Sequence, residues 1–447
     1  MGALTASNLH LLLAQANLSD AFSSTGGNRF FTGLVMIIHM FFAELFVGFA
    51  IAAPFFQLWG ARTGSARMDR LAHSLARFNV LTFSTGATFA VLFVVLLVGL
   101  YPQVTTSLFT HFFYFLAIAM LSMLLALWGM YTYYYKWDRY SVLNKKRHLV
   151  FGFSMGIFIW IWMTIMTGID SYMVTGGGPG SSAITGSNIT SFATAVQGIF
   201  NPMFIELVVH RTFANLSWPA FAVAAWASFM YLRAKTAADK AFYDWTSSVG
   251  LTWGAIFLAL QPLGGFIILY ELKLSRPENP VSQAAAGGAY HRLIHGPTSH
   301  LLYINLVLVV ALFVLSNVAM YLGAGRHPER AGRVPMRFFG LVAAVAGLYS
   351  ISPLADFPFL YMRYIMILIM LLATVGSIVA YLRGRRSFRY GSPGVGYQVA
   401  LLALGTVAAV VALNMGFMKS NSRVPFTVYN QPGYTVENSR PPSGFGR

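Results

Sequence analysis

Ten apolar runs separated by short polar stretches fill most of this chain of 447 residues. About 20 apolar residues in an α-helix are needed to cross the hydrocarbon core of a bilayer. Because lipid offers no hydrogen bonds, a segment that crosses it must satisfy its own backbone groups, as a helix does. The chain is therefore predicted to be all-α, a polytopic transmembrane helical bundle of about ten spans. The expected spans are roughly 31–58, 78–101, 106–135, 149–173, 198–231, 247–271, 301–323, 338–352, 358–382 and 396–418.

The basic residues predict the orientation of these spans. Lys and Arg in short loops favour the cytoplasmic side of a membrane. Of the 30 Lys and Arg residues, 20 fall in five alternate loops, which are 60–77, 136–148, 232–246, 324–337 and 383–394. Both termini are therefore expected on the outer, periplasmic side. Topology explains the formal net charge of +17, so membrane lipid is the expected surrounding and nucleic acid is not an expected partner.

The segments beside the spans divide the chain into parts. The first residues contain an apolar run that is too short to span, which fits a segment at the membrane interface. The loops 174–197 and 272–300 are longer than the other outer turns and are placed to cover a site at the outer surface. The expected parts are 1–28, an outer N-terminal segment; 29–273, helices 1–6; 274–300, an outer loop; 301–418, helices 7–10; and 419–447, an outer C-terminal tail.

Three of the ten histidines lie inside the predicted spans. His39, His111 and His210 are each about two to three helical turns from the outer end of their span, and Met366 is at a similar depth. Imidazole and thioether groups at one level on different helices are suited to axial ligation of haem iron. The chain has no cysteine, which excludes disulfides, thiolate-held iron–sulfur clusters and covalently attached haem. The alternative is that these histidines form hydrogen bonds between helices.

Four arginines lie near the outer ends of the spans. A planar guanidinium suits the carboxylates of haem propionates, which need cations where the haem edge meets water. Snorkelling to lipid headgroups explains the first and last of the four equally well. The four candidates are Arg29, Arg211, Arg363 and Arg423.

Several short motifs recur in a fixed order along the chain. They are Arg29 ten residues before His39; Trp137, Asp138 and Arg139; Asn201 and Pro202 before His210; Arg363 before Met366; and Ser422, Arg423, Val424, Pro425 and Phe426. In these motifs the chain resembles the haem-bearing subunit I of cytochrome bd-type quinol oxidases. The resemblance implies that helices 1–6 bind haem, that His39 ligates one haem, and that His210 and Met366 ligate a low-spin haem. It also implies quinol as a substrate, other membrane subunits as partners and a place in the bacterial inner membrane.

The chain departs from that family where the family carries glutamates. Ile118 and Ala126 occupy the matching positions in the third span, and the glutamate that ligates the middle haem is missing near Leu413 or Asn414. These departures make oxygen reduction doubtful. His111, seven residues before Ile118 on the same helical face, would fill the vacancy as a second ligand with His39. The prediction is two b-type haems, His39/His111 and His210/Met366, that pass electrons between membrane quinol and an outer partner such as a c-type cytochrome.

Four carboxylates are candidates for handling protons or quinol. Glu44 is just over one turn from His39 and Glu206 is one turn from His210, so either could orient a ligand or move a proton. Asp170 and Glu271 lie near outer helix ends. The alternatives are satisfied interhelical pairs for the first two and solvated helix ends for the others. Two other functions stay open: a terminal quinol oxidase that reduces O2, and a transporter or structural subunit without haem.

Overall fold

A computed structural model describes residues 27–175, 191–274, 289–296 and 298–421. Within these residues the regular elements are all helical, and nine helices are long and apolar enough to cross a membrane. A bent pair, α9 and α10, makes a tenth span if the two are counted together. The predicted all-α polytopic bundle is thus confirmed.

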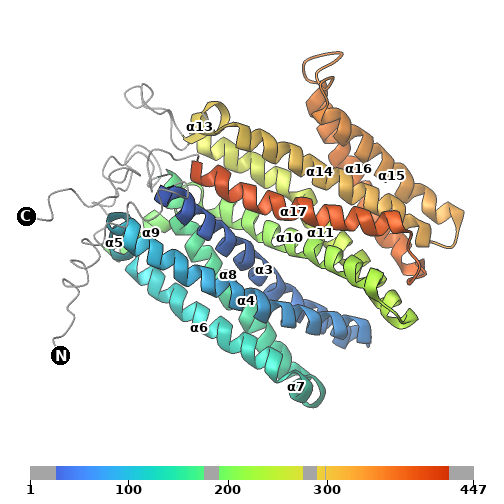
Figure 1. Cartoon of the computed structure of the whole chain (residues 1–447), viewed down its shortest axis with the longest axis horizontal. Helices are drawn as coiled ribbons and strands as arrows, with labels where there is room; N and C mark the ends of the chain where they lie inside the picture. Colours follow the sequence, from blue (N-terminus) through green and yellow to red (C-terminus); the bar gives the residue numbers. More distant parts are fainter. Residues whose placement is uncertain (1–26, 176–190, 275–288, 297, 422–447) are drawn as a thin grey trace, which may run out of the picture.

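The helices follow one another along the chain and pack side by side (Figure 1). We call the end at which α3 begins the predicted outer end. In chain order they are α3 (Gly27–Thr63), α4 (Ala66–Leu100), α5 (Pro102–His111), α6 (Phe113–Tyr135), α7 (Trp137–Leu143), α8 (Lys145–Thr175), α9 (Phe192–Ile199), α10 (Phe204–Arg233), α11 (Ala237–Leu274), α13 (Ala289–His295), α14 (His300–Gly323), the 3-10 turn Ala324–Arg326, α15 (Arg330–Ile351), α16 (Met362–Gly384), the 3-10 turn Arg385–Ser387 and α17 (Val395–Asn421).

The third predicted span, 106–135, is not one helix. The chain breaks at Phe112, and only α6 is a candidate membrane span. Phe112 is fully buried, and its ring packs edge-on against the ring of Tyr172 on α8, with 5.0 Å between the ring centroids. This anchor fixes the break, which leaves α5 as a separate helix of ten residues at the predicted outer end.

The predicted inner loops are largely helical. The helices α3 and α4 continue through most of 60–77 and leave only a tight turn between Thr63 and Ala66. Gly64 in this turn has φ +67°, a conformation that glycine adopts without steric cost. The segment 136–148 likewise holds α7. Hydropathy marks where apolar sequence stops, but a helix can continue past the bilayer.

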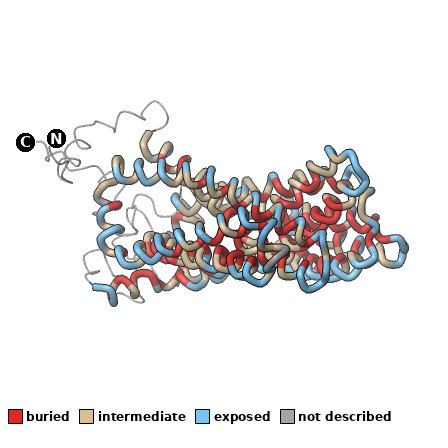
Figure 2. The backbone as a smooth tube through the Cα atoms, turned by 90° about the horizontal axis from the view of Figure 1, so that it is seen from below, coloured by how far each residue is buried: buried red, intermediate tan, exposed pale blue. Residues whose placement is uncertain are grey.

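The burial of side chains distinguishes the interior of the helix bundle from its lipid-facing surface. Figure 2 shows buried stretches within the bundle and exposed ones around it. Large apolar side chains face outwards, as Val91 and Leu263 do with 67% exposure each. In water such a surface would favour aggregation, whereas lipid solvates it.

The contact between α3 and α10 sets the register of the bundle. A Cβ atom at Gly48 would lie 2.1 Å from the backbone oxygen of Asn215 and 2.4 Å from Cγ of Pro219. Only glycine permits the two backbones to approach this closely. Both helices start at the predicted outer end, so positions before Gly48 and before Asn215 lead outwards on both.

A buried ion pair joins several helices at the predicted inner end. Asp244 of α11 is 0% exposed and Arg326 is 2% exposed at the side chain. Arg326 Nε donates to Asp244 Oδ1 at 2.8 Å, and Gly391 N donates to Oδ2 at 2.9 Å. The guanidinium also lies 3.8 Å from the ring centroid of Tyr397 on α17. The pair therefore links α11 to the segments after α14 and before α17.

Candidate haem site

His39 lies on α3 and is held by the neighbouring helix. Its Nδ1 is 3.0 Å from the backbone oxygen of Gly86 on α4. A carbonyl only accepts, so Nδ1 carries the hydrogen and donates it. The neutral imidazole then keeps Nε2 as a free acceptor, which is the arrangement that a metal-ligating histidine needs. His39 thus fits the predicted role of a haem ligand.

His210 lies on α10 against a glycine surface of α11. A Cβ atom at Gly264 would lie 2.8 Å from His210 Nδ1, and one at Gly265 would lie 4.0 Å from Cε1. The Nδ1 atom is buried without a hydrogen-bond partner. Buried polar atoms without a partner are rare and call for a physical explanation. The glycines let the imidazole pack closely on α11, with Nδ1 turned towards Gly264, so Nε2 is the nitrogen that would be left for a haem iron.

The α3–α10 crossing places both imidazoles on the same side of it. His39 is nine residues outwards from Gly48 and His210 is five residues outwards from Asn215. At 1.5 Å per residue these separations are about 14 Å and about 8 Å along the helices. Both side chains therefore lie on the side of the crossing that faces the predicted outer end.

His111 is placed differently from the prediction. It ends α5, outside the third candidate span, because the chain breaks at Phe112. Its Nδ1 is 3.0 Å from the hydroxyl of Ser107, and α5 packs on α4 and α6. The expectation that His111 lies two to three turns inside a span is wrong. Its pairing with His39 remains a prediction.

Met366 lies on α16, which packs against α15 and, less extensively, against α11 and α14. One turn further along α16, Met370 is close to α15: a Cβ atom at Gly347 would lie 2.9 Å from its sulfur. In Figure 1 the α15–α16 hairpin stands at the edge of the bundle, with α14 between it and α10. The structure does not bring Met366 beside His210 through a described contact, so this pairing also remains a prediction.

The candidate arginines divide into two that are paired and two whose side chains are not described. Arg363 bonds Asp356 at 3.1 Å near the start of α16, and both side chains are more than 40% exposed. Arg211 donates to Thr167 on α8. Arg29 is in the first turn of α3, and its side chain is not among those described. Arg423 lies outside the described residues.

Arg211 belongs to a group of four charged residues that we call the outer charge cluster: Glu44 of α3, Asp170 of α8, Arg211 of α10 and Lys419 of α17. Arg211 Nη1 donates to Thr167 Oγ1 at 3.1 Å and lies 3.6 Å from Asp170 Oδ2. Lys419 pairs with the same carboxylate. The charge of Arg211 also acts on Glu44. The sequence identified three members but not Lys419, whose signal was its place at the outer end of the last span.

The remaining two carboxylates lie close together near the predicted outer end. Glu206 is in the first turn of α10 and Glu271 is in the last turn of α11, and their carboxyl groups interact electrostatically. The Oε2 atom of Glu206 is buried without a hydrogen-bond partner. The described residues contain no cluster of three or more His, Asp or Glu side chains suited to a single metal ion. A haem with axial ligands from separate helices needs no such cluster.

The positions predicted to match the family's glutamates hold uncharged side chains. Ile118 is 46% exposed and faces outwards from α6, whereas Ala126 is fully buried. Asn414 of α17 donates to the backbone oxygen of Leu301 at 3.0 Å. None of the three offers a group that ionises.

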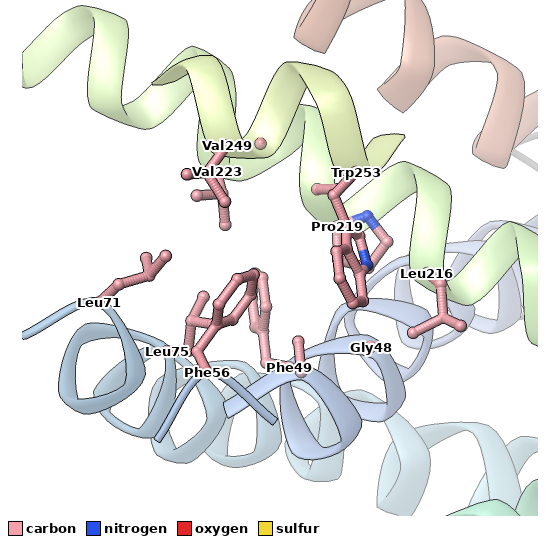
Figure 3. Close-up of a pocket in the computed structure, with 13 residues that line it drawn as sticks. Gly48, Phe49, Phe56, Leu71, Leu75, Leu216, Pro219, Val223, Val249 and Trp253 are labelled. Carbon is pink, nitrogen blue, oxygen red and sulfur yellow. The ribbon is translucent and has the colours of Figure 1, made fainter. Parts of the chain in front are cut away.

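An apolar pocket lies between α3, α4, α10 and α11, at the α3–α10 crossing and inwards from it (Figure 3). The figure shows Leu71 and Leu75 of α4 across the pocket from Val249 of α11. The rings of Phe56 and Trp253 are 5.4 Å apart. The 13 lining residues include none with an ionisable side chain, so this pocket is separate from the histidines.

Comparison with known proteins identifies the family. A family model described as cytochrome bd terminal oxidase subunit I matches residues 28–440. The chain belongs to this family. The family and the apolar helices make it a multi-pass protein of the bacterial inner membrane. The bd oxidase structure from Geobacillus thermodenitrificans is 15% identical, with a TM-score of 0.49, and the match covers 88% of this chain and 96% of that chain. No curated protein matches the chain.

Asn201, before the helix that carries His210, has a structural role. Its side-chain amide donates to the backbone oxygen of Gly168 at 3.2 Å and to Ser171 Oγ at 2.9 Å, both on α8. Its Oδ1 accepts from Met203 N at 3.3 Å. The asparagine thereby fixes the 55° bend between α9 and α10 and so positions the helix that carries His210.

Proposed function

We propose that this bd-family chain is a haem b electron-transfer subunit of a membrane complex, which passes electrons between membrane quinol and a redox partner at the outer face. The observation that carries the proposal is that His39, with Nε2 free, and His210, in its glycine cradle, lie on one side of the α3–α10 crossing. The bd-family membership supports haem and quinol as ligands.

The residues that would hold haem are His39 and His210, with His111 and Met366 as the second ligands of two b-type haems. Bound haem would supply one-electron redox chemistry. The chain's own residues would bind the carboxylate groups and accept the protons. Arg211 would face propionate or other carboxylate groups, and Glu206 with Glu271 would accept the protons that quinol releases on oxidation. Both termini would lie on the outer side, and a periplasmic c-type cytochrome would be the electron acceptor.

A terminal quinol oxidase is the second candidate, and the placement of His111 favours it. A histidine at the end of α5 rather than inside a span would leave the second axial position beside His39 open to oxygen. Against it stand Ile118 and Ala126, which cannot carry protons to that position. A membrane protein without haem is the third possibility, and purification decides that one directly.

The test is haem quantification on purified wild type and on His39→Ala, His111→Ala and His210→Ala. The matched control is His73→Ala, an exposed histidine on α4 near the predicted inner end. We expect one b haem to be lost with His39 or His111 and the other with His210, and none with His73. Carbon monoxide should leave the wild-type spectrum largely unchanged. If CO shifts the spectrum and His111→Ala keeps both haems, the oxidase replaces the electron-transfer proposal.

A further inference from the structure

The two carboxylates of the outer charge cluster, Asp170 and Glu44, differ in their number of cationic neighbours. Asp170 has two cationic neighbours, Arg211 at 3.6 Å and Lys419. Opposite charges at such distances favour the ionised carboxylate. Arg211 is also bonded to Thr167, which keeps its guanidinium turned towards α8. Asp170 is therefore the carboxylate with two cationic partners.

Glu44 reaches the cluster from α3. It is four residues outwards from Gly48, and Arg211 is four residues outwards from Asn215. Because α3 and α10 run in the same direction and touch at Gly48 and Asn215, residues one turn outwards on the two contacting faces meet at the same level. Glu44 therefore depends on a single cation, Arg211, which it shares with Asp170.

Histidines and charged side chains towards the predicted outer end of α3 and of the helices packed on it are Arg29 and His39 on α3, Glu206, His210 and Arg211 on α10, Asp170 on α8 and Lys419 on α17. Of these, Arg211 is the one whose charge acts on Glu44. The helix α4 also packs on α3, and it has no titratable residue from Asn79 to Leu100. With both carboxylates ionised the cluster has no net charge. His210 is next to Arg211 along α10. One negative charge added at the group that His210 would hold is then most easily neutralised by a proton on Glu44, since Asp170 is paired with two cations and both cations are already protonated.

We propose that Glu44 binds a proton when the haem held by His210 is reduced, so that electron and proton uptake are coupled at this site. This inference rests on the proposed function. Glu44 would take one proton from water and become a carboxylic acid, and the electron that reduces a haem held by His210 would come from quinol. Glu44 forms no bond to quinol. Charges interact strongly where water is excluded, which is why the coupling is expected inside the bundle and not at its surface.

The experiment is a redox titration of the purified haem-loaded protein at a series of pH values. In wild type we expect the midpoint potential of the His210 haem to fall with rising pH, by up to about 59 mV per pH unit, the limit for one proton per electron. Glu44→Gln should abolish this dependence, and Glu44→Asp should restore part of it. The control is Asp239→Asn, which removes an exposed carboxylate paired with Arg70 at the opposite end of the bundle and should keep the wild-type slope.

Reduced-minus-oxidised infrared spectra supply a second readout. Wild type should gain a carboxylic acid C=O band on reduction that shifts in D2O, and Glu44→Gln should lack it. A haem-loaded Glu44→Gln variant with the wild-type slope and band would overturn the inference alone. A wild type without haem would overturn the proposed function instead. If Glu44→Gln fails to assemble, a pH-independent potential in wild type is sufficient to overturn the inference.

Discussion

The glycine cradle at His210 gives a sharp prediction, because two adjacent glycines of α11 differ in how close they come to the imidazole. A Cβ atom at Gly264 would lie 2.8 Å from His210 Nδ1, whereas one at Gly265 would lie 4.0 Å from Cε1. Ordinary contacts begin at 3.4 Å, so Gly264→Ala forces the ring away by about 0.6 Å, the difference between 3.4 and 2.8 Å. Gly265→Ala requires no movement.

The expected cost follows from overpacking a filled site, which is about 1–3 kcal/mol. At about 1.4 kcal/mol for each factor of ten, haem binding at His210 should weaken roughly 5-fold to 150-fold in Gly264→Ala. Alanine is intrinsically favoured over glycine within a helix by about 0.8–1.0 kcal/mol. Both substitutions gain this helix propensity equally, so the difference in haem affinity between the two variants reports the contact with the His210 ring alone.

The assay is the haem content of each purified variant by pyridine haemochrome, with the protein titrated by added haem. Gly264→Ala should lose haem at the His210 site and keep the other haem, while Gly265→Ala should match wild type. Equal haem affinity in the two variants would refute the reasoning that this cradle positions the ligand.

Two further predictions concern stability. Arg326→Met should lower the free energy of unfolding by about 3–5 kcal/mol because it leaves Asp244 charged and buried without its partner. In a thermal unfolding assay, the double variant Arg326→Met with Asp244→Leu should recover much of this loss. An equal loss of stability in the single and the double variant would argue against the ion pair. Gly48→Ala should reduce the yield of folded protein, since its Cβ would lie 2.1 Å from the backbone oxygen of Asn215, whereas Gly33→Ala meets nothing within 4 Å and should leave the yield unchanged.

The sequence predicted the fold class and most of the membrane spans because both depend on local hydropathy. The position of His39 and His210 towards the same end of the bundle followed from counting residues along regular helices. The family resemblance rested on spaced motifs, and the match over residues 28–440 confirms it. These features are encoded within single segments of the chain.

Other features depend on contacts between distant segments, so no local pattern predicted them. The break at Phe112 has no proline or glycine at its site and arises from packing on Tyr172. The pair of Asp244 and Arg326 joins residues 82 positions apart. The position of Met366 depends on how α16 packs with α15, and a count of turns along one helix cannot supply that arrangement.

The most direct test of the central claim is a reduced-minus-oxidised absorbance spectrum of the purified wild-type protein, with the haem counted by pyridine haemochrome. We predict two b-type haems per chain that are both reduced by a quinol analogue. A purified, folded protein with no haem bands would contradict the account and leave only the family fold.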